Sequence, residues 1–533
     1  MKRLHFSENG YALLVGSLTL ALGGCGSAGN AVGASDSGAS PDGASVNTTG
    51  HNDGGSGDSS FADATSSVSP MDSGVGGDST LATDGSATGT DASTSTDGGT
   101  VSSDATFPPS DTGACPTGNA ICSATTWTEI AAAHTVPSWV KSTKLGIGMH
   151  FMVATVPADH NEWFIQHEYC NGSFATWTST YFPKTSPLSG GPWGYKDFIP
   201  LFTVSQWSQP AAAHAATTAA SWAALFKASG ATYVNATAMH HERFAMWDSS
   251  EPASIGGAGT WNAAKMGPKR DVVGELGAAV KAQGLKFGVN NHFLYAYSFV
   301  YCGPDGTTVG NVGPNTSAEV SDLYDPRYAS FYGPPNPGCG VTAKDGQCNP
   351  SAAFCSDWLY RAEELVDKYE LDDEWFDWDG ATVANSPCMD DKLAFALHYY
   401  QTAAGRGQEV QIMSKGGVFP DMNNTATGAN VALQDFQSSI PTGNAVPTSP
   451  WMVDETISSN GSWCYVDANG GAPGSSPMAY KSSAEVIDEL EQINAAGGIM
   501  MLNISPMSDG TIPSEQVDIL NAVGKHLGAS GDF

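Results

Sequence analysis

The sequence is poor in basic residues. It holds 22 Lys and Arg against 54 Asp and Glu, which gives a formal net charge of -32 at pH 7. Nucleic acids and anionic membrane surfaces are bound by clustered Lys and Arg, so this shortage argues against both as partners. Twelve of the negative charges are Asp residues in 26–113, and about -21 remains for the residues that follow. A neutral ligand such as a sugar is not excluded.

Long hydrophobic runs are also missing. The apolar run Tyr11–Leu22 follows Lys2 and Arg3 and is too short to span a bilayer, so residues 1–25 are expected to be an export signal. The run ends in Leu-Gly-Gly-Cys, which resembles a bacterial lipoprotein cleavage box and would make Cys25 the lipid-carrying first residue of the mature chain. An ordinary signal peptide with an unrelated Cys is the alternative. Either way, we expect an exported bacterial protein: an envelope lipoprotein of the outer membrane, or a secreted protein.

Residues 26–113 contain scarcely any aromatic or branched side chains and consist mainly of Gly, Ser, Thr, Ala and Asp. Such a chain cannot offset its conformational entropy by burial, so a disordered linker is expected there. The predicted organisation is therefore a signal at 1–25, a linker at 26–113 and one catalytic domain at 114–533.

The ten cysteines of an exported chain indicate disulfides. Cys115 and Cys122 are close enough to close a small loop, and Cys302, Cys339, Cys348 and Cys355 lie together in another segment, but the sequence assigns no pairing. If Cys25 carries lipid, nine cysteines remain and at least one is unpaired. The sequence has no Cys-x-x-Cys pair, so a structural zinc site has no support.

Nucleotide-binding motifs are absent too, since neither GxGxxG nor GxxxxGK[ST] occurs in the required context. What is present is a repeated alternation of helix, glycine and apolar strand, as in the helix 271–283, Gly284 and the strand 285–289. This alternation predicts an α/β fold of the (β/α)8 barrel type. The expected strands are 144–151, 231–237, 285–289, 374–377, 409–413 and 499–504.

Polar side chains follow these strands, where a barrel builds its active site. The residues concerned are His150, His240, Asn290, Asp377 and Asn503. The adjacent pair His240-His241 could fill the core, bind a polar substrate, or ligate a metal with His150, His160 and His167. Residues 371–380 hold five carboxylates and two tryptophans, which is compatible with a catalytic cluster or with a solvated acidic turn. Asp372, Asp373 and Glu374 are expected at the strand entry or on the surface.

Six segments in order resemble motifs of the α-L-fucosidase family of glycoside hydrolases (family 29). They span roughly Lys144 to Pro513 and comprise 144–150 with Glu162-Trp163, 230–233, 237–249, 267–276, 375–377 and 497–513. The resemblance implies an exo-acting, retaining hydrolase that releases α-L-fucose from fucosylated glycans by double displacement, without a cofactor or a metal. Such enzymes need two carboxyl groups, one ionised and one protonated.

The resemblance also implies residue roles. Asp377 matches the nucleophile, with Asp379 as the competing assignment. The substrate-binding positions are His150, Glu162, Trp163, His240, His241, Asn290 and Trp463.

The chain departs from the family at several positions. The family's acid/base glutamate often follows a tryptophan, but here Met452 follows Trp451. Glu455 is the preferred acid/base, and Asp454 and Asp435 stay open. If none of these three carboxylates reaches the glycosidic oxygen, the chain is a weak or inactive surface carbohydrate-binding relative.

Other differences bear on the substrate and on the domain content. Asn290-Asn291-His292 replaces a Tyr-Tyr-Ser run, and Ser414-Lys415-Gly416 replaces Asn-Asp-Arg-Gly. The chain ends at Phe533, so the β-sandwich that follows the barrel in many members is expected to be absent. The fucosyl linkage and the oligomeric state are not predicted.

Overall fold

The computed structural model describes residues 113–158, 162–170, 193–210, 215–297, 299–300, 322–323, 325–333, 350–379, 387–419, 431–447, 450–467, 477–529 and 533. The predicted export signal, Cys25, nearly all of the predicted linker, and His160 lie outside these residues. The account below concerns the described residues only.

Eight parallel strands close into a barrel in sequence order, with β1 pairing both β2 and β8. The predicted barrel is therefore confirmed. The strands are β1 (Leu145–Met149), β2 (Tyr233–Met239), β3 (Lys286–Asn291), β4 (Asp373–Phe376), β5 (Gln411–Lys415), β6 (Ala432–Asp435), β7 (Trp451–Thr456) and β8 (Gly498–Ile504).

The two strands that the sequence pattern missed are β6 and β7. β6 is only four residues long and ends in Gln434 and Asp435, while β7 carries Asp454 and Glu455. Both strands contain buried charged or polar side chains among apolar ones. Neither is therefore a continuous apolar run, which is the pattern that predicts a buried strand.

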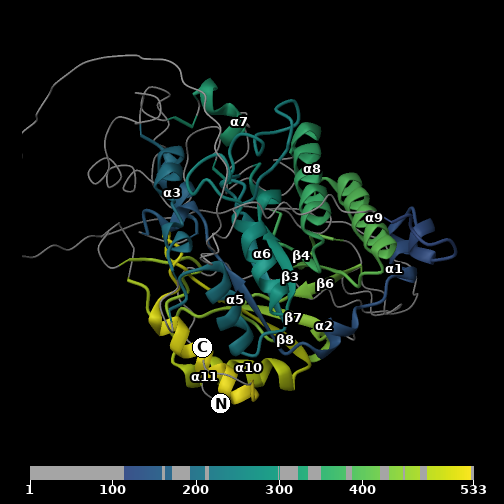
Figure 1. Cartoon of the computed structure of the whole chain (residues 1–533). Helices are drawn as coiled ribbons and strands as arrows, with labels where there is room; N and C mark the ends of the chain where they lie inside the picture. The colour runs from purple at the N-terminus through teal and green to yellow at the C-terminus, as the bar shows by residue number, and fades with distance from the viewer. Residues whose placement is uncertain are drawn as a thin grey trace, which may run out of the picture. The chain divides into compact units, whose positions relative to one another are not determined.

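Helices surround the barrel, as Figure 1 shows for α5, α6 and α8 beside the strands. In α6 the Asp271 side chain accepts a hydrogen bond from the Gly274 N–H, which caps the helix start as expected for Asp at that position. No helix in the described ranges is long and apolar enough to cross a membrane. The helices are α1 (Trp127–Ala133), α2 (Ser138–Ser142), α3 (Phe164–Cys170), α5 (Ala219–Ala228), α6 (Val272–Ala282), α7 (Ala329–Tyr332), α8 (Ala352–Tyr369), α9 (Met389–Arg406), α10 (Ser483–Ala495) and α11 (Ser514–Leu527).

The barrel interior is filled by a compact group of side chains that we call the barrel core. Its members alternate along the strands with residues that face the helices, as the period of two requires. On β7, for example, Met452 belongs to the barrel core, whereas Trp451 and Val453 pack with the helices. The barrel core comprises Tyr233, Trp375, Met413, Leu433, Met452, Ile499 and Met501. Functional groups must therefore lie beyond this core, at the strand ends.

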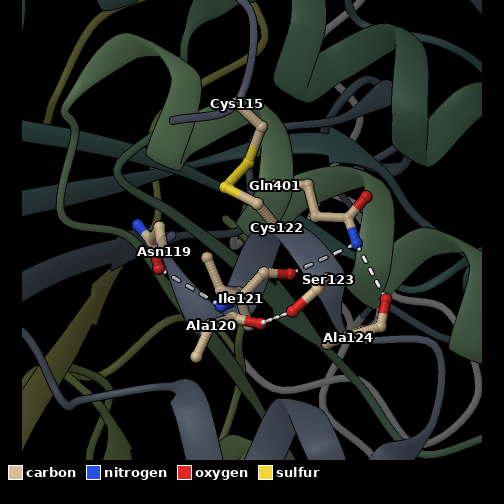
Figure 2. The surroundings of a disulfide bond; sticks show 8 residues. All are labelled: Cys115, Asn119, Ala120, Ile121, Cys122, Ser123, Ala124 and Gln401. Atoms are coloured by element: carbon tan, nitrogen blue, oxygen red, sulfur yellow. Dashed lines mark hydrogen bonds between the residues drawn. A yellow bond between two sulfur atoms is a disulfide. The ribbon is translucent and has the colours of Figure 1, made fainter. Parts of the chain in front are cut away.

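The segment before the barrel is fastened to α9. Cys115 and Cys122, which the sequence places close enough to close a small loop, form a disulfide. Figure 2 shows the Gln401 side chain donating to the carbonyl oxygens of Ile121 and Ala124, at 3.2 and 3.0 Å. A second disulfide joins Cys355 to Cys388, and Cys464 is a buried free cysteine.

Gly146→Ala should destabilise the barrel by about 1–3 kcal/mol, because overpacking a filled interior forces neighbours to move. A Cβ at Gly146 would lie 2.0 Å from the ring of the fully buried Tyr233. At Gly148, on the same strand, the nearest atom is 3.1 Å away on the flexible Met501 side chain, so Gly148→Ala is the matched control. Urea unfolding of both variants would measure the difference, and equal losses would contradict the packing account.

Candidate active site

Four histidines from three strand ends meet at one end of the barrel. His150 follows β1, His240 and His241 follow β2, and His292 follows β3. The His292 ring is central, with ring centroids 5.0 Å from His150, 4.5 Å from His240 and 5.4 Å from His241. The structure thus brings together three histidines that the sequence singled out and one that it did not.

Asp377 follows β4 and lies against two of these rings. Its backbone N–H donates to the carbonyl of Asn291, which fixes its position beside β3. Its Oδ2 atom lies 3.4 Å from His241 Nε2 and 3.2 Å from His292 Nδ1. Burial raises the pKa of this carboxyl, but the imidazoles of His292 and His241 outweigh burial and hold the pKa well below its usual value. Asp377 is therefore ionised at neutral pH.

The exposure of Asp377 also differs from that of its neighbours. Its side chain is 19% exposed, whereas those of His241 and His292 are each 3% exposed. The charged oxygen is thus the part of the cluster that an incoming ligand can reach.

Hydrogen bonds fix the tautomer of two rings. Nδ1 of His241 lies 2.7 Å from the carbonyl oxygen of His292, which can only accept, so this nitrogen carries the hydrogen. Nδ1 of His150 lies 2.7 Å from Asn503 Oδ1, and the Asn503 amide nitrogen donates to the Trp463 carbonyl. His150 Nδ1 is therefore a donor as well. In the neutral form of both rings, Nε2 carries the lone pair.

Burial keeps most of these rings neutral. It lowers the pKa of His150 to about 3, and it also lowers the pKa values of His240 and His292. The site therefore offers several neutral imidazoles beside one carboxylate. This combination suits hydrogen bonds from the hydroxyl groups of a sugar.

Aromatic rings border the histidines. The Trp463 ring lies 5.5 Å from that of His150, and Phe299 lies 4.2 Å from His241. Trp163 packs against Phe299, with ring centroids 4.9 Å apart, so the Phe299 ring lies between Trp163 and His241 in this chain of contacts. Trp378, next to the nucleophile candidate, is 42% exposed. These rings provide apolar faces of the kind that carry sugar rings.

Glu162, just before α3, is the second carboxyl group linked to Asp377. It accepts a hydrogen bond from the backbone of Trp463, and its buried Oε2 has no hydrogen-bond partner among the described residues. Burial, together with the charge of Asp377, raises its pKa to about 7. Glu162 can thus hold a proton at a pH where Asp377 cannot.

A buried charged cluster lies next to the site inside the barrel. Lys415 Nζ lies 2.7 Å from Asp454 and 3.2 Å from Asp435. Burial lowers the pKa of Lys415, but the charges of Asp435, Asp454 and Asp377 together raise it. Asp435 and Asp454 are each 3% exposed and both are paired with Lys415, so neither is open to a substrate.

Glu455 lies on the other face of β7. Its neighbour Asp454 points into the barrel, so the strand's alternation directs Glu455 outward. There its Oε1 pairs with Lys481 Nζ at 2.9 Å and accepts the N–H of Thr456. This geometry speaks against the sequence-based choice of Glu455 as the acid/base. The motif comparison had placed a carboxylate near Trp451 but could not show which face it occupies.

Two further expectations concern Asp379 and Asn290. Asp379 pairs with Lys392 at 2.8 Å, and both side chains are almost fully buried, so its position does not suit the nucleophile. Asn290 donates to the Met149 carbonyl at 3.0 Å, at the end of β1. That contact fits a role in holding the strand ends together, and the binding of substrate by Asn290 stays a prediction.

His292 was not among the predicted site residues. The signal was present, because it stands directly after β3 just as His150 stands after β1. In the sequence, His292 stands out only as the last residue of Asn290-Asn291-His292, which replaces the family's Tyr-Tyr-Ser run.

Asp379→Asn should destabilise the chain by about 3–5 kcal/mol, since it removes the carboxylate that pairs with the buried Lys392. Asp377→Asn is the matched variant two residues away, and it should destabilise the chain less than Asp379→Asn does, because Asp377 is 19% exposed and loses contacts with imidazoles and not with a buried ammonium group. Urea denaturation followed by tryptophan fluorescence would compare the two. If Asp377→Asn lowered the free energy of unfolding more than Asp379→Asn does, the assignment of Asp379 as structural and Asp377 as functional would be contradicted.

Comparisons with known proteins show which family the chain belongs to. The sequence model of the family described as Alpha-L-fucosidase matches residues 117–532. Tissue α-L-fucosidase of Rattus norvegicus is 26% identical over 400 residues, covering 74% of this chain and 69% of the relative. The α-L-fucosidase of Dictyostelium discoideum is 24% identical over 426 residues, covering 76% and 73%. A solved structure described as an α-L-fucosidase aligns with a TM-score of 0.50 at 23% identity, covering 76% of this chain and 78% of that one, and supports the fold. The chain belongs to the α-L-fucosidase family.

Proposed function

We propose that this chain is an exo-acting, retaining glycosidase that releases α-L-fucose from glycans, with Asp377 as nucleophile and Glu162 as general acid and base. One observation carries the proposal: a carboxylate whose pKa is well below its usual value interacts with a second carboxyl group whose pKa is raised to about 7. Double displacement needs one ionised and one protonated carboxyl group in one site.

In the first step, an Asp377 oxygen forms a bond to the anomeric carbon while the bond to the leaving oxygen breaks. Glu162 gives its proton to that oxygen, so the leaving group departs as an alcohol. In the second step, Glu162 takes a proton from water, and the water oxygen displaces Asp377 from the anomeric carbon. Glu162 is then protonated and Asp377 is ionised again, as at the start.

The surrounding residues suit recognition of a terminal sugar. Neutral His150 presents an acceptor nitrogen for a hydroxyl group, and the rings of Trp463 and Phe299 offer apolar contact for a methyl group or a ring face. His292 lies 5.2 Å from Trp375 of the barrel core, so the site is closed on the barrel side.

We also propose that the protein is exported and attached to the cell envelope through Cys25. The disulfides Cys115–Cys122 and Cys355–Cys388 support an oxidising compartment. The alternative is a carbohydrate-binding protein without activity, and it is favoured by the pairing of Asp435 and Asp454 with Lys415 and of Glu455 with Lys481. We prefer an enzyme, because Glu162 offers a second carboxyl group that interacts with Asp377.

Asp377→Gly should lower kcat for an aryl α-L-fucoside by at least about 10³-fold, since no other carboxylate can form the covalent intermediate. Azide should restore turnover in this variant by attacking the anomeric carbon directly, and the glycosyl azide should have inverted configuration. Product analysis by NMR would establish this. Normal turnover without azide would contradict the assignment of Asp377.

Glu162→Gln should lower kcat strongly for fucosides with poor leaving groups and much less for an activated aryl fucoside, because only poor leaving groups need the proton. The wild-type kcat/KM should fall as the pH rises through about 7, since Glu162 loses its proton there. The variant should lack this alkaline limb.

Glu455→Gln is the matched control for Glu162→Gln, because it makes the same chemical change on the outer face of β7. It should keep both the alkaline limb and the dependence on the leaving group. If Glu455→Gln abolished the fall of kcat/KM above pH 7 and Glu162→Gln kept it, the acid/base would be Glu455.

A further inference from the structure

His292 gives the site an arrangement of donors that sugar binding alone does not require. Its side chain is 3% exposed, and neither ring nitrogen has a hydrogen bond of good geometry among the described residues. Nδ1 lies 3.2 Å from Oδ2 of Asp377. A buried imidazole with two unsatisfied nitrogens calls for a ligand that those nitrogens can bind.

The second unusual contact is between His241 and Asp377. Because Nδ1 of His241 donates to the His292 carbonyl, Nε2 is the ring nitrogen left to bind a proton or a metal ion. That nitrogen lies 3.4 Å from the charged Oδ2 of Asp377. A metal ion bound to both atoms would take the place of a proton between them. In proteins, a histidine that binds a metal through one ring nitrogen usually donates a hydrogen bond from the other ring nitrogen, often to a backbone carbonyl oxygen.

We propose that His241, His292 and Asp377 form a binding site for a divalent transition-metal ion of the zinc class. The donor atoms are His241 Nε2, His292 Nδ1 and Asp377 Oδ2, which all lie within 4.8 Å of one another. Zinc bonds of about 2.0–2.1 Å in a tetrahedron place neighbouring donors about 3.3 Å apart. The two distances to Asp377 Oδ2, 3.2 and 3.4 Å, match that spacing.

The donor types select among metals. Two imidazole nitrogens and one carboxylate suit zinc, nickel or copper, whereas magnesium and calcium prefer ligand sets made of oxygen atoms. Three protein donors leave a fourth position open to water or to a sugar hydroxyl. His150 and His240 approach the other side of His292, and with it they form a second possible donor group. The site next to Asp377 is the one that we assign, since it includes a charged ligand.

The ion would act as an inhibitor and not as a cofactor. A metal bound to Asp377 Oδ2 occupies the oxygen that the proposed function uses for attack on the sugar. Zinc and the terminal sugar should therefore exclude each other. This consequence rests on the proposed function, whereas the metal site itself does not, and the sequence-based expectation of metal-free catalysis is kept.

Isothermal titration of the chelator-treated full chain with zinc chloride, in a buffer free of phosphate, tests the site. We expect one ion per chain with a dissociation constant in the micromolar range or below. His292→Ser and the isosteric Asp377→Asn should each weaken binding by at least about tenfold. Circular dichroism would verify that each variant is folded. If the His292 variant does not fold, the zinc affinity of the Asp377 variant tests the proposal.

The matched control is His398→Ser, because His398 also pairs with an aspartate, Asp367 at 2.9 Å, on a more exposed surface of α8 and α9. Its zinc affinity should equal that of the wild type. The proposal is overturned if the wild type binds no ion stoichiometrically. It is equally overturned if both site variants bind zinc as tightly as the control.

Kinetics separate this proposal from the proposed function. With an aryl α-L-fucoside, zinc should inhibit competitively, and EDTA should restore the full rate without lowering it further. If the chain has no fucosidase activity, the proposed function is contradicted. Calorimetry would still show whether the chain binds zinc at the proposed site. Activity that requires zinc, or that zinc leaves unchanged at saturation, would overturn the inhibitory role.

Discussion

The site depends on one carboxylate that stays ionised among buried imidazoles. Burial alone would raise the pKa of Asp377, and only its contacts with His241 and His292 reverse that effect. Those two rings are in turn fixed by the ends of β2 and β3, and one of them donates to the backbone of the other. The register of neighbouring strands therefore sets the charge state of the nucleophile candidate. The same contacts also account for the affinity for metal that we infer.

The barrel core supports this arrangement from the inside. Trp375 of β4 packs near His292 and donates from its indole N–H to Asp435. Asp435 and Asp454 hold the Lys415 ammonium group, which also interacts electrostatically with Asp377. The positive charge thus lies on the barrel side of the site, and the carboxyl group of Glu162 lies near Trp463. The two carboxyl groups differ in pKa because Asp377 contacts two imidazoles, whereas burial and the charge of Asp377 act on Glu162.

The sequence predicts the barrel and most of the histidine cluster, because glycine-terminated helices and polar residues after apolar strands are local patterns. It cannot predict which face of a short strand a side chain occupies when the strand itself is missed, and Glu455 on β7 is the example. Asp373 and Glu374 were expected at the strand entry or on the surface, yet both are fully buried and accept hydrogen bonds from Asn235 and Asn291. Such pairing across strands becomes visible only once the register is known.

The exchange at Met452 explains why the second carboxyl group has to come from outside the barrel. Met452 is fully buried in the barrel core, where an ionised glutamate would need a cationic partner. The nearby cation, Lys415, is already shared by Asp435 and Asp454. A third carboxylate in that interior would be protonated or would displace one of the two. In the function that we propose, Glu162 avoids this competition, since it precedes α3 and its buried Oε2 has no hydrogen-bond partner among the described residues.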